Sequence, residues 1–115
     1  MEVSYHREMK KNYLMIEART PEKGLELAVK TLKEIHRESG RKNPVAKITG
    51  SRLNKRGILA SASKLAGKDL IVEEAGDLTS AMLKELDQMI ERDTTGMRIL
   101  LIDNPKQMET MNRQN

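Results

Sequence analysis

The sequence predicts a three-layer α/β/α domain built around a mostly parallel, four-stranded sheet. Apolar runs at 13–16, 45–48, 69–72 and 98–102 alternate with segments whose apolar residues recur at helical spacing. Strands that alternate with helices form parallel sheets with right-handed crossovers and helices on both faces. Because 115 residues suffice for one modest core, we expect a single domain over residues 1–115.

The four predicted strands differ in how they should be buried. The runs at 13–16, 69–72 and 98–102 are almost continuously apolar, which is typical of strands covered on both faces. The run at 45–48 is more amphipathic and suits the edge of a sheet. Residues 1–12 are polar and basic, and we expect a short helix or a flexible lead-in there.

Capping residues mark the predicted helices. Thr20 and Pro21 are typical of a helix start and Gly40 of a helix end. A second helical pattern stops at Gly67, and Thr79 has the place of an N-cap. A short helix follows the last strand and extends to about residue 111. Because the chain stops soon after that helix begins, we expect a fragment or one domain of a longer protein.

The composition excludes several kinds of site. The chain has no cysteine, which excludes disulfides, thiolate zinc sites and a cysteine nucleophile. No apolar run approaches the ~20 residues of a membrane span. The N-terminus also lacks the apolar segment of a signal peptide. We therefore expect a cytoplasmic protein that makes no membrane contact.

Positive charge is concentrated in the first part of the chain. Residues 1–68 hold sixteen Lys and Arg against seven Asp and Glu, and residues 69–115 hold five against ten. A basic face for nucleic acid is one interpretation. Stacking aromatics are nearly missing, so we expect no nucleic-acid partner. We also expect the basic stretch 47–56 to be a solvated loop. His6 and His36 have no metal-ligand partner at helical spacing, so we expect both at the surface.

Polar residues follow the predicted strands where α/β proteins bind ligands, at the strands' carboxyl ends. The third strand ends in Glu73 and Glu74, and the fourth in Asp103, Asn104 and Pro105. The run Leu-Ile-Val-Glu-Glu at 70–74 resembles the Walker B motif of the AAA-type ATPases, within the P-loop NTPases, although that family usually has Asp at the first acidic position.

The resemblance spans roughly residues 13–112 and is strongest to degenerate AAA-type domains of uncharacterised bacterial proteins. It implies the sheet order 1-4-3-2, with the last of the four strands between the first and the third. It also implies that Glu73 is the metal-side carboxylate and Glu74 the residue that polarises the attacking water. Asp103 or Asn104 would be the sensor of the γ-phosphate. The family's fifth strand, arginine finger and helical lid have no counterpart in the sequence.

The phosphate-binding loop of that family is not intact. A Walker A motif, G-x-x-x-x-G-K-[ST], belongs between the first strand and the first helix. Placing Lys23 at the lysine position puts Glu17 and Glu22 where the glycines belong, and Gly24 where the hydroxyl belongs. Pro21 also removes an N–H group from the loop. The sequence therefore predicts no tight ATP binding in the usual mode.

Three functions remain open. The leading hypothesis is a non-catalytic P-loop NTPase-like module without a cofactor, which regulates or contacts a protein partner or other domains of a parent chain. The alternative is a domain that binds or hydrolyses ATP with Mg²⁺, using catalytic Glu74, metal-binding Glu73, and nucleotide contacts from Lys23 and Asn104. A third is a receiver-like signalling domain with Glu73 in place of the phosphate-accepting Asp, which a sheet order of 2-1-3-4 would favour.

Overall fold

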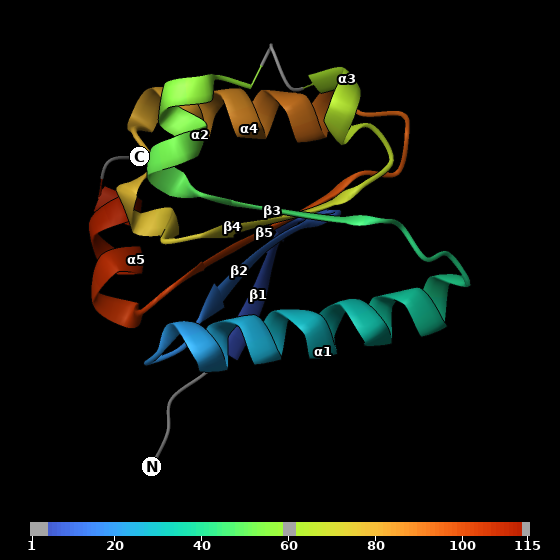
Figure 1. Ribbon diagram of the computed structural model, residues 1–115, viewed down its shortest axis with the longest axis horizontal. Helices are drawn as coiled ribbons and strands as arrows, with labels where there is room; N and C mark the ends of the chain where they lie inside the picture. Colours follow the sequence, from blue (N-terminus) through green and yellow to red (C-terminus); the bar gives the residue numbers. More distant parts are fainter. Residues whose placement is uncertain (1–4, 59–61, 114–115) are drawn as a thin grey trace.

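A five-stranded mixed sheet forms the centre of the computed structural model, which describes residues 5–58 and 62–113, with side chains over 9–58 and 62–109 (Figure 1). The strand order is β1-β2-β5-β4-β3. The strands are β1 Tyr5–Lys10, β2 Tyr13–Glu17, β3 Val45–Thr49, β4 Asp69–Glu73 and β5 Arg98–Asp103.

The last four strands are parallel neighbours in the order β2-β5-β4-β3, which is the order 1-4-3-2 for the four predicted strands. The prediction of four strands is wrong, because β1 pairs antiparallel with β2 inside the expected lead-in. A two-residue turn joins the two strands, with Asn12 at a φ of 66°. Asn tolerates this left-handed conformation better than most residues. The strand β1 carries too many charges to show an apolar pattern of its own.

The helices cover both faces of the sheet, so three layers are present (Figure 1). Helix α1 lies on one face, and α2, α3 and α4 lie on the other. A 3₁₀ turn, η1, follows β4, and α5 packs beside it at the end of the sheet. The bounds are α1 Pro21–Ser39, α2 Gly50–Arg56, α3 Ala62–Leu65, η1 Ala75–Asp77, α4 Ser80–Arg92 and α5 Pro105–Arg113.

The segment between β3 and β4 differs from the prediction of one helix ending at Gly67. It forms two short helices, and α2 begins directly after β3, where the Thr49 hydroxyl accepts a hydrogen bond from the Arg52 N–H. Gly57, at a φ of 74°, ends α2 and donates its N–H to the Leu53 carbonyl. Residues 59–61 of the predicted helix lie outside the described residues.

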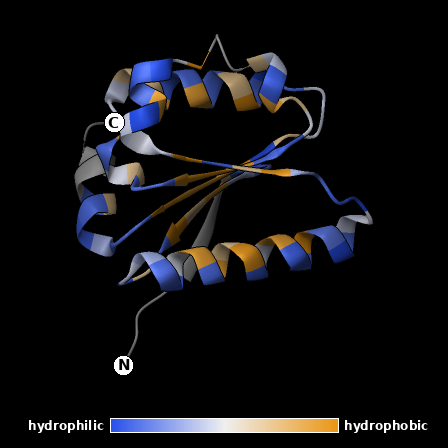
Figure 2. Ribbon diagram, in the orientation of Figure 1, coloured by the Kyte–Doolittle hydropathy of each residue, from blue (hydrophilic) through white to orange (hydrophobic). Residues whose placement is uncertain are grey.

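Two apolar clusters hold the layers together. The larger cluster fills the space between the sheet and α2, α3 and α4, with Met15, Leu86 and Leu101 at its centre. The smaller cluster lies beneath α1 and includes Ile16 and Leu32. In Figure 2 the inner strands are mainly hydrophobic, whereas α1 and α4 alternate between hydrophobic and hydrophilic residues. Among the residues that the structure describes, no helix has the length and apolar character to cross a membrane.

Candidate functional site

A shallow pocket lies where the four parallel strands end. It is lined by residues 18–21, by Thr49, by Glu73 and Glu74, and by residues 102–104. Three of the four predicted site residues, Glu73, Glu74 and Asn104, therefore meet at one edge of the sheet. The pocket has a volume of about 130 Å³. Small-molecule sites usually occupy roughly 300–1,000 Å³, so this pocket has room for a few atoms rather than a nucleotide.

The loop between β2 and α1 uses its own backbone donors. The Ala18 N–H donates to the carbonyl of Asp103, at 3.2 Å between N and O. The Lys23 N–H donates to the hydroxyl of Thr20, which caps α1, and the Gly24 N–H donates to the Thr20 carbonyl. Pro21 at the first helical position has no N–H to offer. A phosphate-binding loop needs several free N–H groups that point to one spot, and the N–H groups of Ala18, Lys23 and Gly24 are already used within the protein.

Gly24 has a packing role. A Cβ atom built on it would lie 2.5 Å from Cγ2 of Ile102, so the bare backbone lets α1 approach β5 closely. Gly24 is itself buried in the first turn of α1. Close approach of helix and sheet therefore accounts for this glycine without a ligand.

Lys23 does not line the pocket. Its side chain is half exposed, and its ammonium group lies 3.7 Å from the Glu26 carboxylate, one turn further along α1. The structure thus separates Lys23 from the other three predicted site residues. Lys23 lies in the first turn of α1, which Thr20 caps and which packs closely on β5 through Gly24.

The acidic end of β4 is open to solvent. Oε1 of Glu73 lies 3.6 Å from Nζ of Lys47, on the neighbouring strand β3. Glu74 is exposed and has a left-handed backbone, with φ 53° and ψ 44°. This conformation costs roughly 1–2 kcal/mol for a residue with a Cβ atom. Within the part of the chain that the structure describes, no group of three or more acidic or histidine side chains is arranged to hold a metal ion.

Asp103 and Asn104 hold the chain at the end of β5. The Asp103 carboxylate accepts hydrogen bonds from the backbone N–H groups of Gly76, at 2.9 Å, and of Asn104, at 2.8 Å. The Asn104 side-chain oxygen accepts one from the Gln107 N–H in the first turn of α5. These contacts fasten η1 and α5 to the sheet, which is the turn-and-cap role that such residues commonly have.

Glu17 stands where the Walker A motif would have its first glycine, and most of the residue is buried. It ends β2 in register with Asp103 of β5, and it is 8% exposed. Its carboxylate makes no hydrogen bond or ion pair with the described residues. Glu17 thus adds one more acidic residue to this end of the sheet, and these carboxylates would repel a bound triphosphate.

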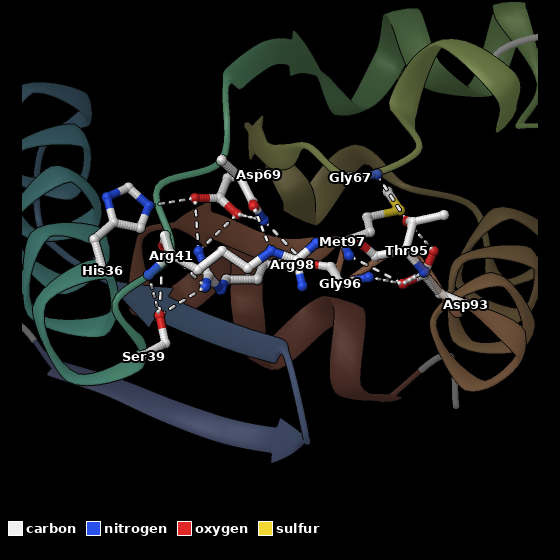
Figure 3. Close-up of polar contacts among 11 residues, drawn as sticks. His36, Ser39, Arg41, Gly67, Asp69, Asp93, Thr95, Gly96, Met97 and Arg98 are labelled. Carbon is white, nitrogen blue, oxygen red and sulfur yellow. Dashed lines mark hydrogen bonds and ion pairs between the residues drawn. The ribbon is translucent and has the colours of Figure 1, made fainter.

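A second polar cluster lies at the opposite ends of the strands (Figure 3). Asp69, which is fully buried, accepts hydrogen bonds from Asn43 at 2.9 Å and Arg98 at 3.2 Å, and lies 2.8 Å from Nε2 of His36. Arg98 also donates to the Ser39 hydroxyl. The expected surface position of His36 is therefore wrong, since its side chain is 15% exposed and faces Asp69. A buried charge surrounded by its partners is typical of structural clusters.

Asp93 organises the turn that leads into β5 (Figure 3). Its carboxylate accepts hydrogen bonds from the N–H groups of Thr95, Gly96 and Met97 and from the Thr95 hydroxyl. Burial alone would raise the pKa of Asp93, but these hydrogen bonds outweigh it and hold the pKa below its ordinary value.

Comparison of the chain with models of protein families, with curated proteins and with solved structures returns no match. The geometry of the two ends of the sheet is therefore the evidence for a function.

Proposed function

We propose that this chain is a non-catalytic domain with a P-loop NTPase-like scaffold, and that it acts as an interaction or regulatory module. One observation carries the proposal. The loop after β2, where such a scaffold would hold phosphates, has its N–H groups at Ala18, Lys23 and Gly24 bonded within the protein. Pro21 contributes none. These three N–H groups are thus not free to bind a phosphate, which supports a loop that has lost its nucleotide.

The strand order supports the scaffold. The order β2-β5-β4-β3 is the one that the resemblance to the AAA-type domains implies. A receiver-like domain would instead have its first strand between the second and the third. The strand order therefore favours the P-loop NTPase-like scaffold over the receiver-like one.

The charges around the pocket also support an eroded nucleotide site. Glu73, Glu74 and Asp103 line it, and Arg19 is the basic residue among its lining. Three carboxylates against one guanidinium would repel a triphosphate unless bound cations compensated them.

Isothermal titration with MgATP tests the proposal. We expect no binding heat at concentrations up to about 1 mM. Micromolar binding that disappears in Lys23→Ala, but persists in Lys30→Ala, would overturn it. Lys30 is an exposed lysine further along α1 and serves as the matched control.

ATP hydrolysis is the second candidate, and the backbone of Glu74 favours it. Residues held in left-handed conformations cluster at functional sites, and Glu74 lies beside Glu73 in the pocket. Hydrolysis would be supported by ATP turnover that is lost in Glu74→Gln and kept in Glu34→Gln, an exposed position on α1. If the non-catalytic proposal holds, all three proteins release phosphate no faster than buffer.

A further inference from the structure

The strand β3 has a free edge. It is the last strand of the sheet and pairs with β4 alone among the described residues. The Asp69 N–H of β4 donates to the carbonyl of Pro44, so the backbone of Pro44 faces β4. Because successive residues of a strand direct their backbone groups to alternate sides, those of Ala46 and Ile48 also face β4, whereas those of Val45 and Lys47 face outward. Their N–H and C=O groups are a template for another strand.

The side chains along this edge are accessible. Val45 is 55% exposed, and Lys47 is 51% exposed. Helix α1 packs against β2, β5 and β4, so it leaves the adjoining face of β3 open. The ion pair of Lys47 with Glu73 is at the surface, where such pairs are weak. The lysine can therefore turn to an acidic group on an added strand.

The chain segment that contains β3 is strongly basic, although Glu73 of the neighbouring β4 pairs with Lys47. Residues 37–56 include one acidic residue, Glu38, and several Lys and Arg residues whose side chains are all exposed. These are Arg37, Arg41, Lys42, Lys47, Arg52, Lys55 and Arg56. A partner that approaches this edge gains from negative charge, which would also speed its association.

We infer that the outer edge of β3 binds an extended acidic segment of a partner protein as an added strand. The segment would alternate apolar and acidic side chains. Its acidic side chains would lie on the face of Val45 and Lys47, where one meets Lys47. Its apolar side chains would lie on the opposite face, beside the partly buried Ala46 and Ile48. Backbone hydrogen bonds would supply affinity and the side chains specificity, as in other cases of strand addition. The inference rests on the proposed function as an interaction module and names the partner's chemistry.

Two other occupants fit less well. A second copy of this chain, paired β3 to β3 about Lys47, would set lysine against lysine, and like charges directly opposite are destabilising. A single-stranded nucleic acid would need aromatic side chains on which bases stack. The two tyrosines are in β1 and β2, on the far side of the sheet from β3.

A titration followed by NMR tests the inference on the full chain labelled with ¹⁵N. The probe is a capped heptapeptide that alternates valine and glutamate, and the control peptide has lysine in place of glutamate. We expect the amide signals of Val45 and Lys47 to shift and their hydrogen exchange to slow about tenfold or more. The amides of Ala46 and Ile48 already face β4 and should change little. Affinity should fall as salt rises, because the contact is electrostatic.

Variants of Lys47 separate the charge from the backbone. Lys47→Glu should weaken binding about tenfold or more, whereas Lys47→Arg and the distant control Lys30→Glu should not. Lys47→Pro removes an outward N–H without touching the ladder to β4, so the protein should stay folded while the peptide no longer adds a strand. Circular dichroism checks the fold of each variant.

Several results would overturn the inference. One is the absence of amide shifts at Val45 and Lys47 up to about 1 mM peptide, and another is equal peptide affinity for Lys47→Glu and the wild type. Amide shifts on dilution of the protein alone would reveal a second copy as the occupant. Binding of single-stranded DNA in place of the peptide would also overturn the inference. The nucleotide titration reports separately on the proposed function. Failure of peptide binding without MgATP binding refutes this partner alone, whereas micromolar MgATP binding refutes the proposed function.

Discussion

At the scale of single residues, the charges with the strongest structural roles lie away from the pocket. Asp69 is fully buried, and Asn43, Arg98 and His36 surround it. In the described part of the chain, every fully buried side-chain nitrogen and oxygen atom has a hydrogen-bond partner. The pocket differs, since Glu74 is exposed there in a left-handed conformation. The buried Asp69 cluster therefore has the character of a structural element, whereas the exposed Glu74 lies where a ligand could reach it.

Replacing Asp69 should destabilise the fold strongly. Asp69→Asn keeps the shape but leaves Arg98 buried without a counter-charge, and breaking a buried pair in this way costs roughly 3–5 kcal/mol. Urea denaturation measures the loss in the free energy of unfolding. Asp77→Asn, at an exposed aspartate, should change that free energy by less than about 0.5 kcal/mol. A loss for Asp69→Asn no larger than that of the control would show that the cluster does not stabilise the fold.

Asp93 gives the fold an acid-sensitive turn. Its folded pKa is lowered by the hydrogen bonds from residues 95–97, so its contribution is full above the unfolded pKa of about 3.9 and is lost as pH falls through the folded value. Asp93→Asn keeps an acceptor oxygen but removes its charge. It should lower the free energy of unfolding at neutral pH by about 1 kcal/mol, because hydrogen bonds to a charged group are stronger than those to a neutral one by roughly that amount. Urea denaturation should show this difference shrinking below a pH of about 3.9. A difference that stays constant from neutral to acid pH would contradict the assignment.

At the scale of elements, apolar periodicity and capping residues predicted the four parallel strands and the starts of α1 and α4. The four apolar runs are strands in the implied order, and Thr20 and Thr79 cap α1 and α4 through their hydroxyls. The pocket residues Glu73, Glu74 and Asn104 could be placed together because parallel strands end at the same edge. The strand β1 could not be predicted, since its polar sequence becomes a strand through its pairing with β2.

The position of Lys23 also lay beyond the sequence. Motif spacing places it at a phosphate, but the direction of its side chain depends on how closely α1 packs on β5. Gly24 allows the close distance between α1 and β5. Packing between elements of this kind produces no periodic pattern in the sequence. The split between α2 and α3 escaped prediction for a similar reason, because it depends on the backbone conformation at Gly57.

The packing role of Gly24 can be tested by a single methyl group. Gly24→Ala would place a Cβ atom 2.5 Å from Cγ2 of Ile102, and overpacking of this kind usually costs about 1–3 kcal/mol. Thermal unfolding should therefore shift to lower temperature. Val29→Ala, at an exposed position on the same helix, serves as the control and should have a much smaller effect. If Gly24→Ala unfolds at the wild-type temperature, α1 does not depend on this close approach.

At the scale of the whole molecule, the sheet has two unlike edges. One edge is β3, which is short and carries a central lysine within a basic segment of the chain. The other edge is β1, which covers β2 and pairs with it along its length. All five residues of β2 are buried, so β1 protects a strand that would otherwise be an apolar edge.

This protection predicts the effect of removing β1. Deleting residues 1–10 would leave β2 with unpaired backbone groups beside buried apolar side chains such as Met15 and Ile16, and exposed edges of that kind promote aggregation. We expect size-exclusion chromatography to show aggregates, and thermal unfolding to lose cooperativity. Lys10→Ala is the control: it removes only the exposed ion pairs with Asp87 and Glu91, and exposed pairs contribute little to stability. A deleted chain that stays monomeric and unfolds like the full chain would mean that β2 does not need β1 for its protection.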